Sequence, residues 1–193
     1  MALIGTRDKI LSVASKLFSR YGFHKTSMDE IAKTARKAKG SLYYHFASKE
    51  DLFKEIVSKE IINLKGQLSL IIVNDTLSAS EKIKNYFNLR MKILHDASTY
   101  NETLKADFFE HFSFIDGIRK DFDEWEKENI RSVFNQGIDS EEFSIETDIN
   151  KLVDIYIMVL KGLEVPLFVQ EKYDDYVPYF NGLSDIFIKG LGK

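Results

Sequence analysis

A short basic segment near the N-terminus has side chains that can bind a phosphate backbone. Residues 39–46, KGSLYYHF, include a lysine, a serine, two tyrosines and a histidine. All of these side chains can contact phosphate oxygens. Leu42 and Phe46 are four residues apart, which is the spacing of the buried side of a helix. The pattern predicts a helix that packs through one face and presents the other face to a polyanion.

The distribution of charge points to the same end of the chain. Residues 1–49 contain 10 Lys and Arg and 3 Asp and Glu, a net charge of +7. The rest of the chain contains 17 Lys and Arg and 27 Asp and Glu, a net charge of −10. Chance clustering on a solvated surface is the alternative explanation. A basic end on an acidic body indicates that a polyanion such as DNA binds there.

Three further helices are expected to position this segment. Apolar spacing predicts a first helix over residues 6–21, with Gly22 as its C-terminal stop. Ser27 and Glu30 form a capping-box pattern that begins a second helix over residues 27–35. The third helix, over residues 39–46, is the phosphate-binding segment itself. A similar cap at Ser48 and Asp51 begins a long fourth helix that reaches about residue 72. The order is that of a helix-turn-helix unit whose third helix enters the major groove.

The remaining sequence is also expected to be helical, because apolar spacings of three and four dominate and strand-like alternation is scarce. We expect helices over residues 78–95, 102–114, 116–136, 148–168 and 174–191, and a loop over residues 137–144. The run from Ile155 to Leu160 is apolar on every side. Such a helix has to be covered by its own core and by a second subunit. The expected fold is all-α, with about nine helices.

Several classes of protein are excluded by what the sequence lacks. No run approaches the roughly 18 apolar residues of a membrane span, and the N-terminus has no signal-peptide pattern. We therefore expect a cytoplasmic chain with no membrane partner. The absence of cysteine excludes disulfides and thiolate sites. Nucleotide-binding and hydrolase motifs are absent, so neither an enzyme nor a cofactor is expected. Asp107, Glu110 and His111 have spacings like those of metal ligands, but the paired E-x-x-H motifs of di-metal bundles are absent, so no metal site is expected.

Two segments resemble the TetR family of bacterial one-component transcriptional regulators. They are LFSRYGFHKTSMDEIA, residues 17–32, and KGSLYYHFASKEDLF, residues 39–53. The resemblance implies a helix-turn-helix DNA-binding domain over residues 1–48. A long helix would join it to a ligand-binding and dimerisation domain over residues 49–193. The residues that the resemblance assigns to DNA contacts are Thr26, Ser27, Lys39, Gly40, Ser41, Tyr43, Tyr44, His45 and Lys49.

The turn between the second and third helices departs from the family pattern. Where the family usually has Ala-Gly-Val-Ser, this chain has Ala35, Arg36, Lys37 and Ala38. The usual Gly suits a backbone conformation that a side chain disfavours by about 1 kcal/mol. Lys37 can fill the site of the usual Val only with its stem. Either the turn is rebuilt, or two additional cations reach phosphate at some cost in stability.

The resemblance also implies an effector site in the helical body and a dimer interface made by the last two helices. The candidate ligand-binding residues, each of which could instead be ordinary core, are Phe87, Met91, Phe108, Phe112, Trp125, Phe134, Tyr156 and Leu160. Arg90, His95 and His111 could meet a polar head group, although a surface position is expected for each. The candidate interface residues are Val159, Leu163, Tyr176, Phe180, Leu183 and Phe187.

Together these patterns predict a homodimeric transcriptional repressor. A small apolar or aromatic effector would release it from a palindromic operator in double-stranded DNA. Two alternatives within DNA binding are an activator and a regulator without a small ligand. The alternative from another class is a helical small-molecule or lipid-binding protein that has no regulatory role on DNA.

Overall fold

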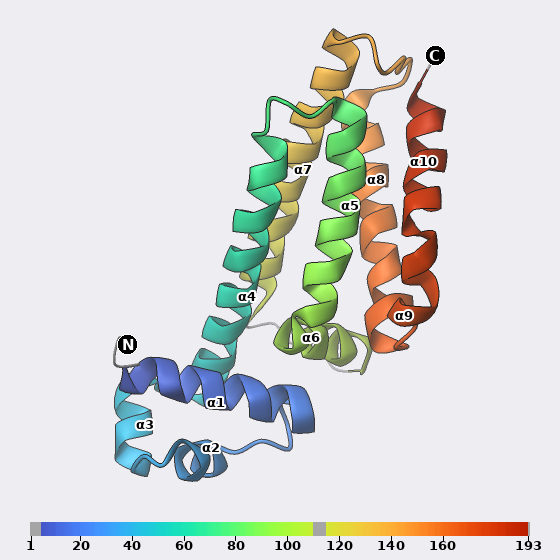
Figure 1. Cartoon of the computed structure of the whole chain (residues 1–193). Coiled ribbons are helices and arrows are strands. Elements are labelled where there is room, and N and C mark those ends of the chain that lie inside the picture. Colours follow the sequence, from blue (N-terminus) through green and yellow to red (C-terminus); the bar gives the residue numbers. More distant parts are fainter. Residues whose placement is uncertain (1–4, 110–114, 193) are drawn as a thin grey trace. The chain divides into compact units, whose positions relative to one another are not determined.

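The structure of the chain is a computed structural model that describes residues 5–109 and 115–192, and every regular element in those ranges is helical (Figure 1). The chain forms two compact units. The first comprises residues 1–61 and 97–115, and the second comprises residues 62–96 and 116–193. The described part of the chain has no helix with both the length and the apolar character that crossing a membrane requires.

The first unit contains α1 (Thr6–Tyr21), α2 (Met28–Ala35), α3 (Lys39–His45), the start of α4 (Lys49–Ile72) and α6 (Ser98–Phe109). Its core is apolar and partly aromatic. The ring of Phe18 lies 5.1 Å from that of Phe53, and the ring of Phe23 lies 5.0 Å from Phe53. Leu42 is fully buried, as is Ile10. The expected bounds of the first four helices are therefore confirmed to within two residues.

The turn after α2 keeps the geometry that glycine usually serves. Arg36 has φ 56° and ψ 48°, which is the left-handed conformation. Its N–H donates to the carbonyl of Lys33 at 3.1 Å, and the N–H of Lys37 donates to the carbonyl of Ala32 at 3.0 Å. These two bonds are the usual closure of a helix C-terminus. The turn is thus not rebuilt, and Arg36 holds a backbone conformation that costs about 1–2 kcal/mol for a side-chain-bearing residue.

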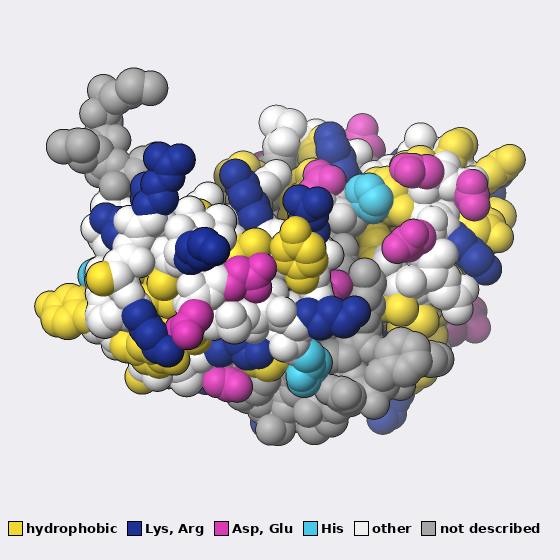
Figure 2. Space-filling model, turned by 90° about the horizontal axis from the view of Figure 1, so that it is seen from below, with side chains coloured by type: hydrophobic (Ala, Val, Ile, Leu, Met, Phe, Trp, Pro, Cys, Tyr) yellow, Lys and Arg dark blue, Asp and Glu magenta, His cyan; other side chains and the backbone are white. Residues whose placement is uncertain are grey.

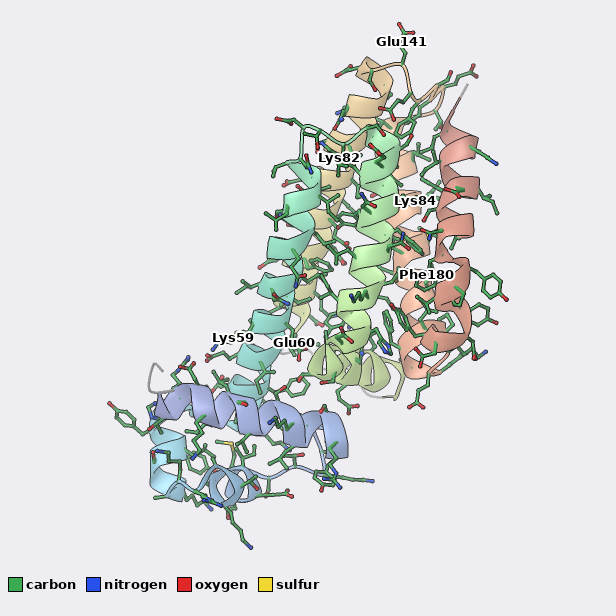
Figure 3. All side chains as sticks on the ribbon, viewed as in Figure 1. Lys59, Glu60, Lys82, Lys84, Glu141 and Phe180 are labelled. Atoms are coloured by element: carbon green, nitrogen blue, oxygen red, sulfur yellow. The ribbon has the colours of Figure 1, made fainter. Side chains whose placement is uncertain are left out.

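The start of α6 is fixed by two polar contacts within the first unit. The carboxylate of Glu60 on α4 accepts from the N–H groups of Thr99 and Tyr100, at 3.3 and 2.7 Å, and lies beside the first turn of α6 (Figure 3). The hydroxyl oxygens of Ser15 and Thr99 are 3.2 Å apart. Burial raises the pKa of Glu60, and the two backbone hydrogen bonds oppose that shift. Glu60 of α4 therefore satisfies the first backbone donors of α6, and Ser15 of α1 contacts the side chain of Thr99.

The second unit is built from the end of α4, α5 (Ala79–Asp96), α7 (Asp116–Asp139), α8 (Ile149–Glu164) and α10 (Phe180–Leu191). Figure 1 shows α5, α8 and α10 running side by side, and α7 packs on both α5 and α8. The rings of Phe87 and Phe180 are 5.2 Å apart, and Lys84 pairs with Asp185 at 2.7 Å. These contacts attach α10 to α5.

Three element boundaries differ from the expected ones. Helix α7 continues to Asp139, three residues past the expected end at Gln136, because Gly137 is a packing residue here. A Cβ at Gly137 would collide with the ring of Phe143, which folds back onto the helix. Helix α8 ends at Glu164 and continues as a wider π-helical turn, Val165–Val169, that contains Pro166. Helix α6 begins at Ser98, earlier than the expected start at residue 102.

The last expected helix, over residues 174–191, is divided. The structure has a four-residue α9 (Tyr173–Tyr176), a 3₁₀ turn (Val177–Tyr179) and then α10. Pro178 explains the division, because proline lacks the N–H that a continuous helix needs and its ring clashes with the preceding turn. The nine longer α-helices in the described residues agree with the expected all-α fold of about nine helices.

The conformation of Arg36 makes a stability prediction. Arg36→Gly should raise the free energy of unfolding by about 1 kcal/mol, because glycine adopts the left-handed region without steric cost. Urea denaturation followed by circular dichroism measures the change. The matched control is Thr34→Gly, at an exposed position inside α2, which should lower stability by about 1 kcal/mol. An Arg36→Gly protein no more stable than the parent would contradict the strain at this turn.

Candidate nucleic-acid interface

Helix α3 is buried on one side and open on the other. Leu42 is 0% exposed and Phe46, directly after the helix, is 3% exposed, whereas Tyr44 is 85% exposed. Tyr43 is less exposed than Tyr44, and Ser41 and His45 are half-buried. The seven-residue helix therefore presents its polar face outward while its apolar face holds it in the core.

The open face of α3 carries a cation and a glycine. Lys39 pairs with Asp29 on α2 at 2.7 Å, and both side chains are exposed. The hydrogen bond to Asp29 and the charge of that carboxylate raise the pKa of Lys39. An exposed pair of this kind contributes little to stability, so a phosphate can replace Asp29 as the partner of Lys39. A Cβ at Gly40 would meet no atom within 4 Å.

Three other cations of the first unit have structural partners. The ammonium of Lys49 donates to the carbonyls of Phe23 and Thr26, at 2.9 and 3.1 Å. It also lies 4.2 Å from the centroid of the Phe23 ring. The ammonium of Lys37 donates to the hydroxyl of Thr6 at 3.0 Å, and the guanidinium of Arg7 pairs with Glu55. Lys49 and Lys37 therefore tie the start of α4 and the α2–α3 turn to neighbouring elements.

Two predicted contact residues at the start of α2, Thr26 and Ser27, have different environments. Thr26 is 1% exposed, and its hydroxyl donates to the carbonyl of Gly22 at 2.8 Å. Ser27 is exposed, and its hydroxyl accepts from the N–H of Glu30 at 3.2 Å, as the capping pattern predicted. The side chain of Thr26 holds the α1–α2 loop, so any contact of Thr26 with phosphate has to come from its backbone. The side chain of Ser27 lies at the surface.

Lys and Arg side chains gather on the α1–α3 side of the face that Figure 2 shows, with a few Asp and Glu side chains among them. A buried rear, an exposed tyrosine pair, an open glycine and this basic surface are what a recognition helix needs to approach DNA.

Comparison with known proteins agrees with this geometry. Residues 10–56 match the family model of bacterial regulatory proteins of the tetR family. The chain is 27% identical to the HTH-type transcriptional regulator QacR of Staphylococcus aureus, over 97% of this chain and 98% of QacR. These matches support a transcriptional regulator of the TetR family, a class of DNA-binding proteins that are not enzymes.

Two other similar transcriptional regulators differ in how much of the chain they match. IcaR of Staphylococcus aureus, a negative transcriptional regulator of the biofilm operon icaADBC, is 45% identical over 51 residues, which are 26% of this chain and 27% of IcaR. A crystal structure of a transcriptional regulator from Cytophaga hutchinsonii is 24% identical and has a TM-score of 0.77. The match covers 95% of this chain and 97% of that one. The fold likeness thus extends over nearly the whole chain, whereas the likeness to IcaR covers about a quarter of it.

The structure brings only some of the predicted effector residues together. Phe87, Tyr156 and Leu160 line a cavity of about 50 Å³ between α5, α8 and α10. Met91 and Phe134 are fully buried core residues, and Trp125 is half-buried beside Lys65. Phe112 and the side chain of Phe108 lie outside the described residues, as do the side chains of Asp107, Glu110 and His111.

The expected surface positions of the polar-head candidates are only partly correct. His95 is exposed and stacks on Tyr173, with ring centroids 4.0 Å apart. Arg90 is instead 1% exposed and forms ion pairs with Glu126 and Glu164, at 2.7 Å each. The helical spacing indicates a buried position for Arg90, because Tyr86 lies four residues before it and Leu94 four residues after it. Both of these residues are buried.

The predicted interface residues lie on α8, α9 and α10 and differ in exposure. Val159, Tyr176 and Leu183 are exposed, and Leu163 is half-buried. Phe180 is only 5% exposed, and Phe187 packs inward on Tyr156, with ring centroids 4.8 Å apart. The register of α10 turns these two rings toward the core of their own chain. Three further exposed apolar residues lie on α8 and α10: Ile155 and Met158, which belong to the run that the sequence predicted to need cover from a second subunit, and Ile186.

The contacts of Lys49 predict a structural role. Lys49→Met should lower the free energy of unfolding by about 1–3 kcal/mol, because two carbonyls lose a charged donor. Thermal and urea unfolding measure the loss. Lys25→Met, at an exposed site, is the control and should change stability by less than about 0.5 kcal/mol. Equal stability of the two variants would show that Lys49 does not hold the loop.

Proposed function

We propose that the chain is a homodimeric, cytoplasmic repressor that binds a palindromic operator and leaves it when a small effector binds. The repressor mode is supported by the similarity of the N-terminal segment to IcaR, a negative regulator. Two recognition helices of a dimer would enter successive major grooves about 34–36 Å apart. The effector would act by binding more tightly to a dimer conformation in which these helices have another separation.

The open face of α3 carries this proposal. Tyr44 is the most exposed of the large apolar and aromatic side chains in the described residues, at 85%. It stands on a helix that also has Gly40 and Lys39 at its exposed start. The side chain is therefore open to contact with a partner. Its hydroxyl and ring can contact the phosphate and sugar of DNA.

Dimer formation is supported by an apolar face in the second unit. Ile155, Met158 and Val159 on α8 are 54%, 68% and 49% exposed, and Ile186 on α10 is 71% exposed. Apolar side chains clustered in this way on the surface of a chain mark an interaction site. A second copy of the chain is the occupant that the family resemblance implies.

A mobility-shift experiment with DNA from upstream of the chain's own gene tests the proposed DNA binding. We expect a retarded band that weakens steeply as salt rises, because binding releases counterions from phosphate. An unrelated duplex of equal length is the control. Equal affinity for the two duplexes would reject operator recognition.

Removing the exposed tyrosine should separate DNA binding from stability. Tyr44→Ala should weaken operator binding by at least about tenfold, a change of about 1.4 kcal/mol. The free energy of unfolding should change by less than about 0.5 kcal/mol, since the side chain is exposed. Tyr21→Ala, at an exposed position on α1, is the control and should leave affinity unchanged. If Tyr44→Ala retains full affinity, Tyr44 makes no important contact with DNA.

Adding one methyl group to α3 should improve stability and impair DNA binding. Gly40→Ala should stabilise the chain by about 0.5–1 kcal/mol, because the helix gains a better helix former. Its affinity for the operator should fall, because the methyl group prevents close approach of phosphate. Gly66→Ala on α4 is the matched control, since a Cβ there also meets no atom within 4 Å. It should stabilise the chain without changing affinity, and equal affinity of both variants would contradict this role of Gly40.

Charge placed on the apolar face should prevent dimer formation. The double variant Met158→Asp, Ile186→Asp should sediment as a monomer at micromolar concentration, because the partner surface would have to bury four unpaired carboxylates. Leu70→Asp on α4, also at an exposed apolar residue, is the control and should stay dimeric. A parent chain that is itself monomeric would reject the proposed dimer.

A further inference from the structure

A buried ionic cluster joins three helices of the second unit. The guanidinium of Arg90 on α5 donates from Nε to Oε1 of Glu126 on α7 at 2.7 Å, and from Nη2 to Oε2 at 3.1 Å. Its Nη2 also donates to Oε1 of Glu164 on α8 at 2.7 Å. The hydroxyl of Tyr86 donates to Oε1 of Glu126 at 2.7 Å. All four side chains are at most 3% exposed.

Two polar groups of this region have no hydrogen-bond partner in the described residues. They are Nη1 of Arg90 and the hydroxyl of Tyr156, which is 4% exposed. Burial raises the pKa of Tyr156, the charge of Glu126 raises it further, and the charge of Arg90 opposes the shift. The hydroxyl therefore lies within electrostatic reach of the cluster. Unpaired buried polar groups are rare in folded proteins, so each of these two has an unused capacity to bond a further partner.

Tyr156 also lies in the wall of a cavity. It lines the cavity of about 50 Å³ together with Ile83, Phe87 and Leu183. A second cavity, of about 200 Å³, lies between the end of α8 and the α9–α10 segment, and Leu183 lines that cavity too. Phe180, which Figure 3 labels, lines the second cavity at the start of α10. One leucine side chain thus belongs to the walls of both cavities, whose volumes together approach the roughly 300 Å³ of small ligand pockets.

The charges of the cluster decide which head group fits. One guanidinium and two carboxylates give a formal charge of −1, so an anionic ligand would add a second uncompensated negative charge to the core. A cationic ligand would need a carboxylate, but both oxygens of Glu126 already accept hydrogen bonds and Glu164 is paired with Arg90. The two groups that remain unpaired, an N–H and an O–H, can both donate.

We propose that the effector is an uncharged, mainly apolar molecule with an accepting oxygen, such as a ketone or an amide. Its apolar body occupies the two cavities on either side of Leu183, and its oxygen accepts a hydrogen bond from the Tyr156 hydroxyl. The regulatory role of this ligand rests on the proposed repressor function. Binding of the ligand at this site does not require that the chain is a repressor.

Three ligands with the same nine-carbon chain test the class. Isothermal titration calorimetry on the full chain at neutral pH compares nonan-2-one, nonanoate and nonyltrimethylammonium. We expect the ketone to bind at least tenfold more tightly than either ion. The proposal is overturned if an ion binds as tightly as the ketone, or if the ketone does not bind.

Two tyrosine variants test the contact. Tyr156→Phe keeps the ring, which packs on Phe134 and Phe187, and removes only the unpaired hydroxyl. Its melting temperature should equal or exceed that of the parent, while its affinity for the ketone should fall about tenfold. Tyr86→Phe removes a hydroxyl that is already bonded to Glu126. It should lower the melting temperature and change ketone affinity by less than twofold. Unchanged ketone affinity in Tyr156→Phe would exclude the hydroxyl as the ligand's partner.

A mobility-shift titration with the ketone separates this proposal from the proposed function. Calorimetric binding that is sensitive to Tyr156→Phe, without release of DNA, would support the site and reject the ketone as an inducer of repressor release. Release of DNA by the ketone with parent affinity in Tyr156→Phe would support the regulator and overturn the site.

Discussion

The position of α3 depends on the burial of two side chains. A seven-residue helix is far too short to be stable alone, so Leu42 and Phe46 have to hold it against α1, α2 and α4. Both are almost completely buried. Their spacing of four residues leaves the other face of the helix, with Tyr44 at its centre, without packing partners. The core of the first unit, which includes the rings of Phe18 and Phe53, therefore has to be packed before α3 can make any contact.

A similar constraint governs the second unit, although a charge is at its centre. Arg90, Glu126 and Glu164 come from three helices, and each would be costly to bury without the others. A cluster of this kind often adds less net stability than apolar packing of the same volume, and its hydrogen bonds join α5, α7 and α8 at three defined positions. Both carboxylate oxygens of Glu126 accept hydrogen bonds, whereas Nη1 of Arg90 has no hydrogen-bond partner in the described residues.

The sequence predicted most of the helices because their apolar stripes and caps are local features. Ser27, Gly22 and the stripe from Ile10 to Phe18 needed no tertiary information. The turn at Arg36 was not decided by the sequence, which left open whether it is rebuilt, and only the structure shows that Arg36 keeps the left-handed conformation. The partners of Lys49 and Lys37 were not predictable, because a long flexible side chain can reach backbone or phosphate from the same place in the sequence.

The burial of Arg90 could be predicted in part, because its position in the helix is a local feature whereas its partners are not. Its spacing from Tyr86 and Leu94 indicates a buried position, and Glu126 has the same relation to Phe122 and Ile130. The residue type argues for the surface, so the two signals conflict at this position. Periodicity can indicate that a charged residue faces the core, but it cannot identify a partner 36 or 74 residues away. That information exists only in the packing of the helices.

The chain connects its two units through α6 as well as through α4. Arg90 lies about two turns before the end of α5 at Asp96, and α6 begins two residues later at Ser98. The first turn of α6 is bonded to Glu60 and Ser15. A shift of α5 along its axis is either absorbed by the short junction between α5 and α6 or passed to α6 itself. The first turn of α6 is held by side chains of α1 and α4, and α4 also carries Leu52 and Phe53 into the core of the first unit.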